Sequence, residues 1–174
     1  MDDSIINEWQ DRLVGHVKSF YLGVIDPLWS QRYAIAVDDL DPVYFDDDAA
    51  ARAGLKGVIA PPNYIATLRA APGAGPSEVD LLEDGTSPDG RPAIPGLQIM
   101  GGGQSIEFLE PVYCGEKIWG DKKIKSITSR ESKSGKLIII EEEIIYKDES
   151  SVTKIVLINK SLYRIVEGFN GNAE

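Results

Sequence analysis

The N-terminal third of the chain spaces its apolar residues at helical intervals, with one extended stretch between the helices. Residues 4–14 carry apolar side chains about one helical turn apart behind polar residues that suit a helix start, which predicts a short N-terminal helix. Residues 17–24 lack this spacing and favour an extended conformation. Asp26-Pro27 opens a second helical segment, because proline is tolerated in the first turn of a helix. A third helical pattern, over 46–53, stops at Gly54, a residue type that commonly ends helices.

The middle of the chain joins a proline corner to an alanine-rich helix and then to an irregular segment. Residues 57–71 read GVIAPPNYIATLRAA, and Pro61 and Pro62 suit a helix start because a missing N–H group costs little there. The small side chains that follow would let a sheet wrap closely around this helix. Residues 72–96 hold five prolines and little periodicity. An irregular stretch of this length inside a compact domain is usually a functional lid or a mobile loop.

From Gly103 onward the pattern becomes that of β-strands. Segments rich in β-branched and aromatic residues follow one another, with short turn-rich connections at GD, SG and DESS. These segments are SIEFLEPVYCGEKIWG, KKIKSITSRESK, KLIIIEEEIIYKD and SVTKIVLINKSLYRIV. Helices followed by long neighbouring strands predict an α+β fold with an antiparallel sheet rather than a parallel βαβ array. A length of 174 residues suits one domain, which we assign to 1–174.

The charge balance narrows the range of partners. The formal net charge is −10 and the sequence pI is near 4.6, so nucleic acid is excluded as a partner because phosphate binding needs a basic face. Lys122, Lys123 and Lys125 form a small basic group. We interpret it as a solvated strand edge. The alternative is that these lysines meet the phosphates of CoA.

Few residues suit redox, metal or histidine chemistry. Cys114 is the single cysteine, so neither an internal disulfide nor a cysteine metal cage is expected, which fits a reducing cytoplasm. No apolar run is long enough to span a bilayer, and the acidic N-terminus is unlike a signal peptide, so we expect a soluble cytoplasmic protein without a membrane partner. The only histidine, His16, follows the first predicted helix and is expected to be structural or solvated. The glycines of GGGQ, at 101–104, precede a predicted strand and suggest a close approach of the backbone to the sheet or a ligand. No metal or cofactor is expected, because zinc spacings and phosphate-binding loops are missing from the sequence.

Three motifs in this order resemble the N-terminal-type domain of the MaoC-like hydratases and dehydratases. They are YAIAVDDLDPVYFDDDAARAGLKG, VIAPPNYIATL and GGGQSIEFLEPVYCGEKI. The resemblance covers residues 12–166 and implies a hot-dog fold, in which an antiparallel sheet wraps a long central helix. It also implies lyase chemistry on an enoyl-CoA or acyl-carrier thioester, in fatty acid or steroid side-chain metabolism.

The resemblance assigns two positions to catalysis. Active members carry the pattern G-D-x-N-P-x-H, whose Asp and His bind water and move protons. The matching stretch here places Asp39 at the aspartate position and Tyr44 at the histidine position. Hydration near neutral pH needs a group that both takes and returns a proton, and the ordinary pKa is about 6.5 for histidine but about 10 for tyrosine. The replacement is expected to cost on the order of a hundredfold or more in rate, so this chain alone is not expected to hold a working site.

The resemblance also implies that backbone N–H groups near the start of the central helix hold the thioester oxygen. Pro62 removes one such donor, which leaves the amides of Asn63 and Tyr64. Tyr64, Ile65 and Leu68 are candidates for shaping the acyl pocket together with the irregular segment that follows, and the alternative is that they are plain core. The full set of candidate substrate-binding residues is Pro62, Asn63, Tyr64, Ile65, Leu68, Gly102 and Gly103.

The resemblance further implies a role in a larger assembly. Heteromeric and fused members pair one degenerate hot dog with one intact hot dog, and the degenerate half contributes to the acyl tunnel. This chain resembles that half, a non-catalytic subunit of an (R)-specific enoyl-CoA hydratase or 3-hydroxyacyl thioester dehydratase whose second MaoC-like subunit supplies Asp and His. Two alternatives stay open: a homodimeric enzyme that uses Asp39 and Tyr44, and a thioester-binding protein without activity. Thioesterase chemistry through Asp39, Asp41 or Glu107 is a further alternative, since the hot-dog fold does not fix the reaction.

Overall fold

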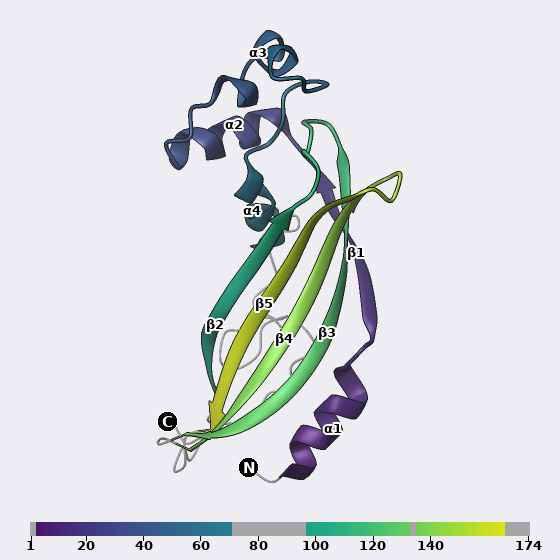
Figure 1. Ribbon diagram of the computed structural model, residues 1–174, viewed down its shortest axis with the longest axis vertical. Helices are drawn as coiled ribbons and strands as arrows, with labels where there is room; N and C mark the ends of the chain where they lie inside the picture. Colours follow the sequence, from purple (N-terminus) through teal and green to yellow (C-terminus); the bar gives the residue numbers. More distant parts are fainter. Residues whose placement is uncertain (1–2, 71–96, 133–134, 166–174) are drawn as a thin grey trace, which may run out of the picture.

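The computed structural model describes residues 3–70, 97–132 and 135–165. In chain order the elements are α1 (Asp3–Leu13), β1 (Val17–Val24), α2 (Pro27–Ala36), the 3-10 turn η1 (Pro42–Tyr44), α3 (Asp47–Arg52), the 3-10 turn η2 (Pro62–Tyr64), α4 (Ile65–Ala70), β2 (Leu97–Phe108), β3 (Lys117–Ser132), β4 (Gly135–Asp148) and β5 (Thr153–Ile165). Figure 1 shows a long curved sheet with α2 and α3 beyond one end, α4 against the sheet near that end, and α1 toward the other end. The segment from α2 to α3, which contains Asp39 and Tyr44, therefore lies at one end of the sheet.

The sheet has five strands in the order β1-β3-β4-β5-β2, and every neighbouring pair is antiparallel. This confirms the predicted antiparallel α+β fold. Within the described residues, β2 pairs only with β5, so the other side of β2 forms an edge of the sheet.

The first three helices lie within one residue of the starts that the sequence indicated. The Asp26 carboxylate accepts a hydrogen bond from the Trp29 amide at 2.9 Å and so caps α2, whose first residue is Pro27. Asp46 caps α3 in the same way through the Ala49 amide. Gly54, after α3, has a φ of +79°, a conformation that glycine adopts without strain. The first helix, expected over 4–14, is α1 (Asp3–Leu13).

Two glycine-containing segments lie inside strands, which corrects the predicted strand boundaries. β2 starts at Leu97, so the glycines at 101–103 belong to this strand and form an irregularity in its pairing with β5 rather than preceding a strand. Gly120-Asp121, expected as a turn, lies within β3. Residues 109–116 lie between β2 and β3, where Pro111 has no N–H to donate and Gly115 has a φ of +89°.

Gly120 is part of β3 because an aromatic ring occupies the place of its side chain. Phe20 of β1 is its direct cross-strand neighbour, and a Cβ atom added to Gly120 would overlap the Phe20 ring. Phe20 in turn meets Tyr146 edge to face, with ring centroids 6.4 Å apart. Gly120, which the sequence suggested as part of a turn, therefore leaves room for the Phe20 ring to pack on the sheet.

Helices cover one face of the sheet at two places. The residues at 138, 140, 144 and 146 of β4 alternate toward the same face and divide into two clusters. The first cluster packs against η2 and α4 and consists of Leu22, Ile25, Ala60, Tyr64, Ile65, Val112, Ile118, Ile144, Tyr146, Ile155 and Leu157. The second packs against α1 and consists of Ile6, Trp9, Ile127, Ile138, Ile140 and Tyr163.

The described part of the central helix is short. The proline corner forms η2, and the helix continues as α4 up to Ala70. The irregular segment at 72–96 lies outside the described residues, so its role as a lid or loop stays a prediction. Among the helices of the described ranges, none has the length and apolar character that crossing a membrane requires.

The contact between Gly120 and Phe20 yields a stability prediction. Gly120→Ala should lower the free energy of unfolding by about 1–3 kcal/mol, because the new methyl group displaces a packed ring. Gly101→Ala is the matched control, since a Cβ there meets nothing within 4 Å. Urea denaturation of both variants measures the difference, and equal effects at the two positions would contradict the packing described here.

Candidate functional site

The segment between α2 and α3 brings the two catalytic-position residues together. After α2 the chain turns at Asp38, which has a φ of +58°, and the Asp39 amide donates to the Ala34 carbonyl at 3.0 Å. Asp41 then caps η1 by accepting from the Val43 amide at 3.0 Å. Tyr44, at the end of η1, is buried with only 8% of its surface exposed. Its hydroxyl donates a hydrogen bond to the Asp39 carboxylate.

The surroundings of Tyr44 hold it in the neutral form. Burial raises the pKa of the Tyr44 phenol, and the charge of Asp39, the hydrogen bond to Asp39 and the charge of Asp41 raise it further. A phenol with an ordinary pKa of about 10 is already a poor base at neutral pH. The raised pKa makes Tyr44 a still poorer proton acceptor near neutral pH, while its neutral hydroxyl can donate a hydrogen bond.

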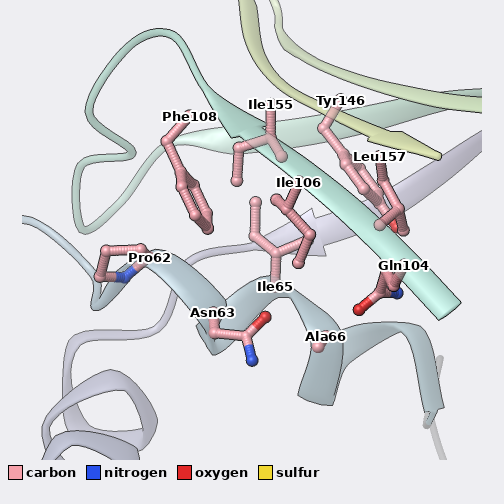
Figure 2. Close-up of a pocket in the computed structure, with 10 residues that line it drawn as sticks. All are labelled: Pro62, Asn63, Ile65, Ala66, Gln104, Ile106, Phe108, Tyr146, Ile155 and Leu157. Carbon is pink, nitrogen blue, oxygen red and sulfur yellow. The ribbon is translucent and has the colours of Figure 1, made fainter.

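An apolar trough runs between the proline corner and the edge strand β2. Its main cavity, of about 270 Å³, is lined by Pro62, Asn63, Ile65, Ala66, Gln104, Ile106, Phe108, Tyr146, Ile155 and Leu157. Figure 2 shows the side chains of Ile65, Ile106, Ile155 and Phe108 converging there, with the amides of Asn63 and Gln104 as polar groups at its margin. A second cavity of about 250 Å³ shares Pro62, Ile65, Phe108 and Ile155 with the first and continues to Leu109 and Val112. The trough therefore lies between η2 with α4 and the face of the sheet formed by β2, β5 and β4, and its lining is mostly apolar.

At the start of the central helix, beside this trough, most backbone N–H groups already have partners. The Tyr64 amide is bonded to the Pro61 carbonyl at 2.9 Å, and the amide of Ile65 is bonded to the Asn63 carbonyl. Pro62 has no N–H. Of the two amides that the sequence suggested for the thioester oxygen, only that of Asn63 has no partner within the described ranges.

The other candidate binding residues lie elsewhere. Tyr64 is a core residue, 3% exposed, whose ring meets that of Tyr33 at 5.7 Å, and burial raises its pKa. Leu68 faces a different cavity, between α4, α1 and β1. Gly102 lies against the Lys160 carbonyl and the Leu162 side chain, and Gly103 has a φ of +115°. Of the seven candidates, the structure brings Pro62, Asn63 and Ile65 together in the trough.

The basic group of β3 is not a strand edge, because β1 pairs with β3 and makes it an interior strand. The Lys122 amine lies 2.9 Å from a Glu142 carboxylate oxygen, and the Lys123 amine lies 2.5 Å from one of Glu143. Lys125 lies 3.6 Å from the second oxygen of Glu143. These lysines pair with the acidic residues of β4, so the three do not form the free group that the CoA-phosphate alternative required.

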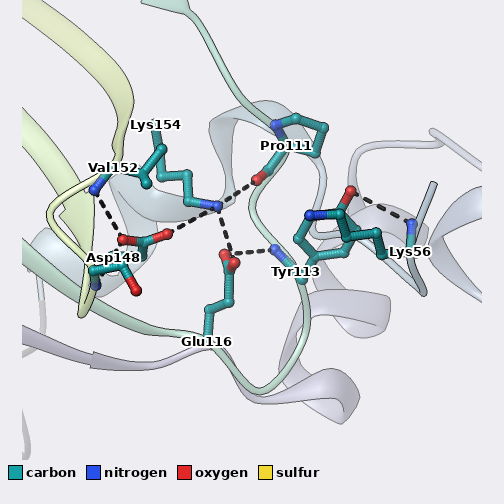
Figure 3. A network of polar contacts seen from close by, with 8 residues as sticks. Lys56, Pro111, Tyr113, Glu116, Asp148, Val152 and Lys154 are labelled. Atoms are coloured by element: carbon teal, nitrogen blue, oxygen red, sulfur yellow. Dashed lines mark hydrogen bonds and ion pairs between the residues drawn. The ribbon is translucent and has the colours of Figure 1, made fainter.

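Sequence reasoning missed a buried ion network that fixes the loop between β2 and β3. The Lys154 side chain is 6% exposed, and its amine lies 2.9 Å from Glu116 and 3.4 Å from Asp148 and donates to the Pro111 carbonyl at 3.2 Å (Figure 3). Burial would lower the pKa of Lys154, but the hydrogen bond and charge of Glu116 and the charge of Asp148 outweigh it and raise the pKa. The network holds the loop that supplies Pro111 and Val112 to the trough. The sequence signal that could have revealed this network is Lys154 itself, a single charged residue in the otherwise apolar start of β5.

The fold is that of a hot-dog domain of the dehydratase class. Residues 30–155 match the model of the FAS1-like dehydratase domain region, and the chain belongs to this family. Among curated relatives, a UPF0336 protein of Mycobacterium leprae is 27% identical over 125 residues, covering 71% of this chain and 70% of the relative. A UPF0336 protein of Mycobacterium tuberculosis is 28% identical over 124 residues, with the same shares of the two chains.

Solved structures with this fold include chains of two-component complexes. A chain of the ChsH1-ChsH2 complex from Mycobacterium tuberculosis matches with a TM-score of 0.75 at 17% identity, over 95% of this chain and 99% of that one. A chain of the HadBC (3R-hydroxyacyl-ACP dehydratase) complex from the same organism matches with a TM-score of 0.61 at 18% identity, over 86% of this chain and 96% of that one. The MaoC-like dehydratase from Rhodospirillum rubrum matches with a TM-score of 0.61 at 17% identity, over 88% of this chain and 93% of that one. The expected MaoC-like hot-dog fold is confirmed.

The position of Tyr44 yields a titration prediction. Asp39→Asn should lower the pKa of Tyr44 toward its ordinary value, because the substitution removes a neighbouring charge and a charged hydrogen-bond acceptor. Asp38→Asn is the matched control, since Asp38 is the adjacent residue and does not contribute to the raised pKa. NMR titration of the tyrosine ring carbons measures both, and an unchanged Tyr44 pKa in Asp39→Asn would contradict the contact.

Proposed function

We propose that this chain is the non-catalytic, acyl-binding subunit of a heteromeric enoyl-CoA hydratase or 3-hydroxyacyl thioester dehydratase. A second MaoC-like subunit supplies the catalytic Asp and His. The observation that carries the proposal is the state of Tyr44, a buried neutral phenol bonded to Asp39 at the position where active members carry histidine. Without a base at this position, water addition by the chain alone lacks its proton acceptor.

The trough beside β2 supports the acyl-binding part of the proposal. Its lining includes residues of β2, an edge strand of the described sheet, and Phe108 and Leu109 near the end of β2 are about half exposed. A second hot-dog sheet added to this edge would cover these side chains and bring its own catalytic residues beside the trough. The substrate in this arrangement is an acyl-CoA or acyl-carrier thioester whose acyl chain lies in the trough, with the Asn63 amide as a candidate donor to its carbonyl oxygen. That two of the solved relatives in fold are two-component complexes favours a heteromer over a homodimer.

Activity measurements separate this proposal from a homomeric enzyme. We expect the purified chain to hydrate a trans-2-enoyl-CoA at least about a hundredfold more slowly than its mixture with an intact MaoC-like chain encoded beside it. Asp39→Asn in this chain should leave the activity of the mixture in place. Turnover by the chain alone at the rate of the mixture, abolished by Asp39→Asn, would establish the homomeric alternative. A stable complex that hydrates none of the enoyl thioesters tested would establish a binding protein without activity.

A second experiment tests the trough as the acyl site. Ala66→Trp should raise the KM of the active complex for a long-chain enoyl-CoA about tenfold or more, because a large ring fills a cavity lined by Ala66. Thr67→Trp is the matched control, since Thr67 is the next residue of α4 and does not line the trough. If both variants raise KM equally, or neither does, the acyl chain lies elsewhere.

A further inference from the structure

A third cavity lies on the opposite side of α4 from the trough. Its volume is about 380 Å³, and it is formed by the end of α1, by β1, by β3 and by Leu68 of α4. It shares no lining residue with the trough, and it sits at the β1 side of the sheet, whereas the trough follows β2. The proposed function gives this cavity no role.

The floor of this cavity is apolar. Its lining includes Phe20, Leu22, Leu68, Ile124 and Ile144. Ile144 is completely buried and Leu22 nearly so, which gives the cavity a packed base that belongs to the core. Such a floor suits a short hydrocarbon chain.

The rim is cationic, and one of its charges is not compensated. Lys18 of β1 and Lys122 of β3 are direct cross-strand partners, so their side chains project to the same face of the sheet, where like charges repel. Glu142 lies 2.9 Å from the Lys122 amine and neutralises it. Lys18 is exposed and has no ion pair within the ranges that the structure describes. A chain of net charge −10 therefore keeps two lysines side by side above an apolar floor.

Two further cationic or ionisable groups complete the rim. Arg12, at the end of α1, and His16, just after it, line the same cavity. Among the residues that the structure describes, Arg12 contacts the exposed Glu8 carboxylate at 3.5 Å, and a contact of this kind contributes little stability. The Lys123 amine is bound to Glu143, and its side chain projects to the other face of the sheet by strand alternation.

We propose that this cavity is a second ligand site, which binds an anionic head group on an alkyl chain. Lys18 and Lys122 bind the anion, and the chain lies across Phe20, Leu22 and Leu68. A fatty carboxylate and the phosphate-bearing part of an acyl carrier share this chemistry. This second site takes no part in the acyl-chain binding that we propose for the trough.

Calorimetry and amide NMR shifts of the full chain test the site, with decanoate, decanol and decanoyl-CoA as probes. Decanoate should bind and shift amides of β1 and of 120–124, and decanol should bind about tenfold more weakly because it lacks the charge. Lys18→Glu and Lys18→Gln should each weaken decanoate binding about tenfold. Glu142→Gln should strengthen it, because it removes the carboxylate that competes for Lys122. Lys117→Glu, an exposed lysine of the same strand as Lys122, carries the same charge change and should have no effect.

Each outcome of these experiments either supports the proposed site or overturns it. If decanoyl-CoA displaces decanoate and shifts the same amides, the site accepts the acyl carrier. If decanoate binds and decanoyl-CoA does not displace it, the natural ligand is a free fatty carboxylate. Equal affinities for decanoate and decanol, unchanged by Lys18→Glu, would overturn the proposed site. Amide shifts confined to α4 and β2, or no binding of any of the three probes, would also overturn it. Circular dichroism of the variants shows whether they are folded.

Discussion

The covering of one sheet face by helices is the constraint on which the rest of the molecule depends. Apolar side chains at alternate positions of β4 face one side, and they are buried only because α1 covers one end and η2 with α4 covers the other. Burial of such surface is the main source of stability in a domain of this size. This packing fixes the proline corner against the sheet and leaves the segment from α2 to α3 beyond the sheet end (Figure 1). Tyr44 is buried in that segment, and the burial that contributes to the fold also raises the pKa of its phenol.

Much of the fold follows from local signals in the sequence. Asp26, Asp46 and Gly54 mark helix ends through capping and backbone preference, which act within a few residues and so can be read from the chain alone. The strand boundaries near Gly120 were wrong because the deciding contact is with Phe20, one hundred residues earlier in the chain. The same holds for the basic group of β3, whose apparent edge position disappears once β1 pairs with it.

The candidate site was likewise predicted from the sequence only in part. The motif identified Asp39 and Tyr44, and their hydrogen bond is local because the two residues lie close together in the chain. The trough was only half predicted: Pro62, Asn63 and Ile65 line it, but Phe108 and Ile155 come from strands whose register the sequence does not reveal. Lys154 was missed because its partners Glu116 and Asp148 meet it only in the folded sheet.

The helix α4 separates two kinds of environment on the covered face. Ile65 lines the trough beside the open edge strand, whereas Leu68, three residues later, lines the cavity with the cationic rim. The lining of the trough includes the edge strand β2, and that of the cationic cavity includes α1 and β1. Under the proposed function, the trough belongs to the shared active site and the cationic cavity belongs to this chain alone.

The central claim is that a second subunit completes the site across the free edge of β2. Hydrogen–deuterium exchange of the β2 amides, in the chain alone and with an intact MaoC-like partner, tests it most directly. We expect the outward-facing amides of β2 to exchange quickly in the isolated chain and to become strongly protected in the complex, while those of β1 do not change. A complex in which β2 exchanges as fast as before, with protection at β1 instead, would contradict it.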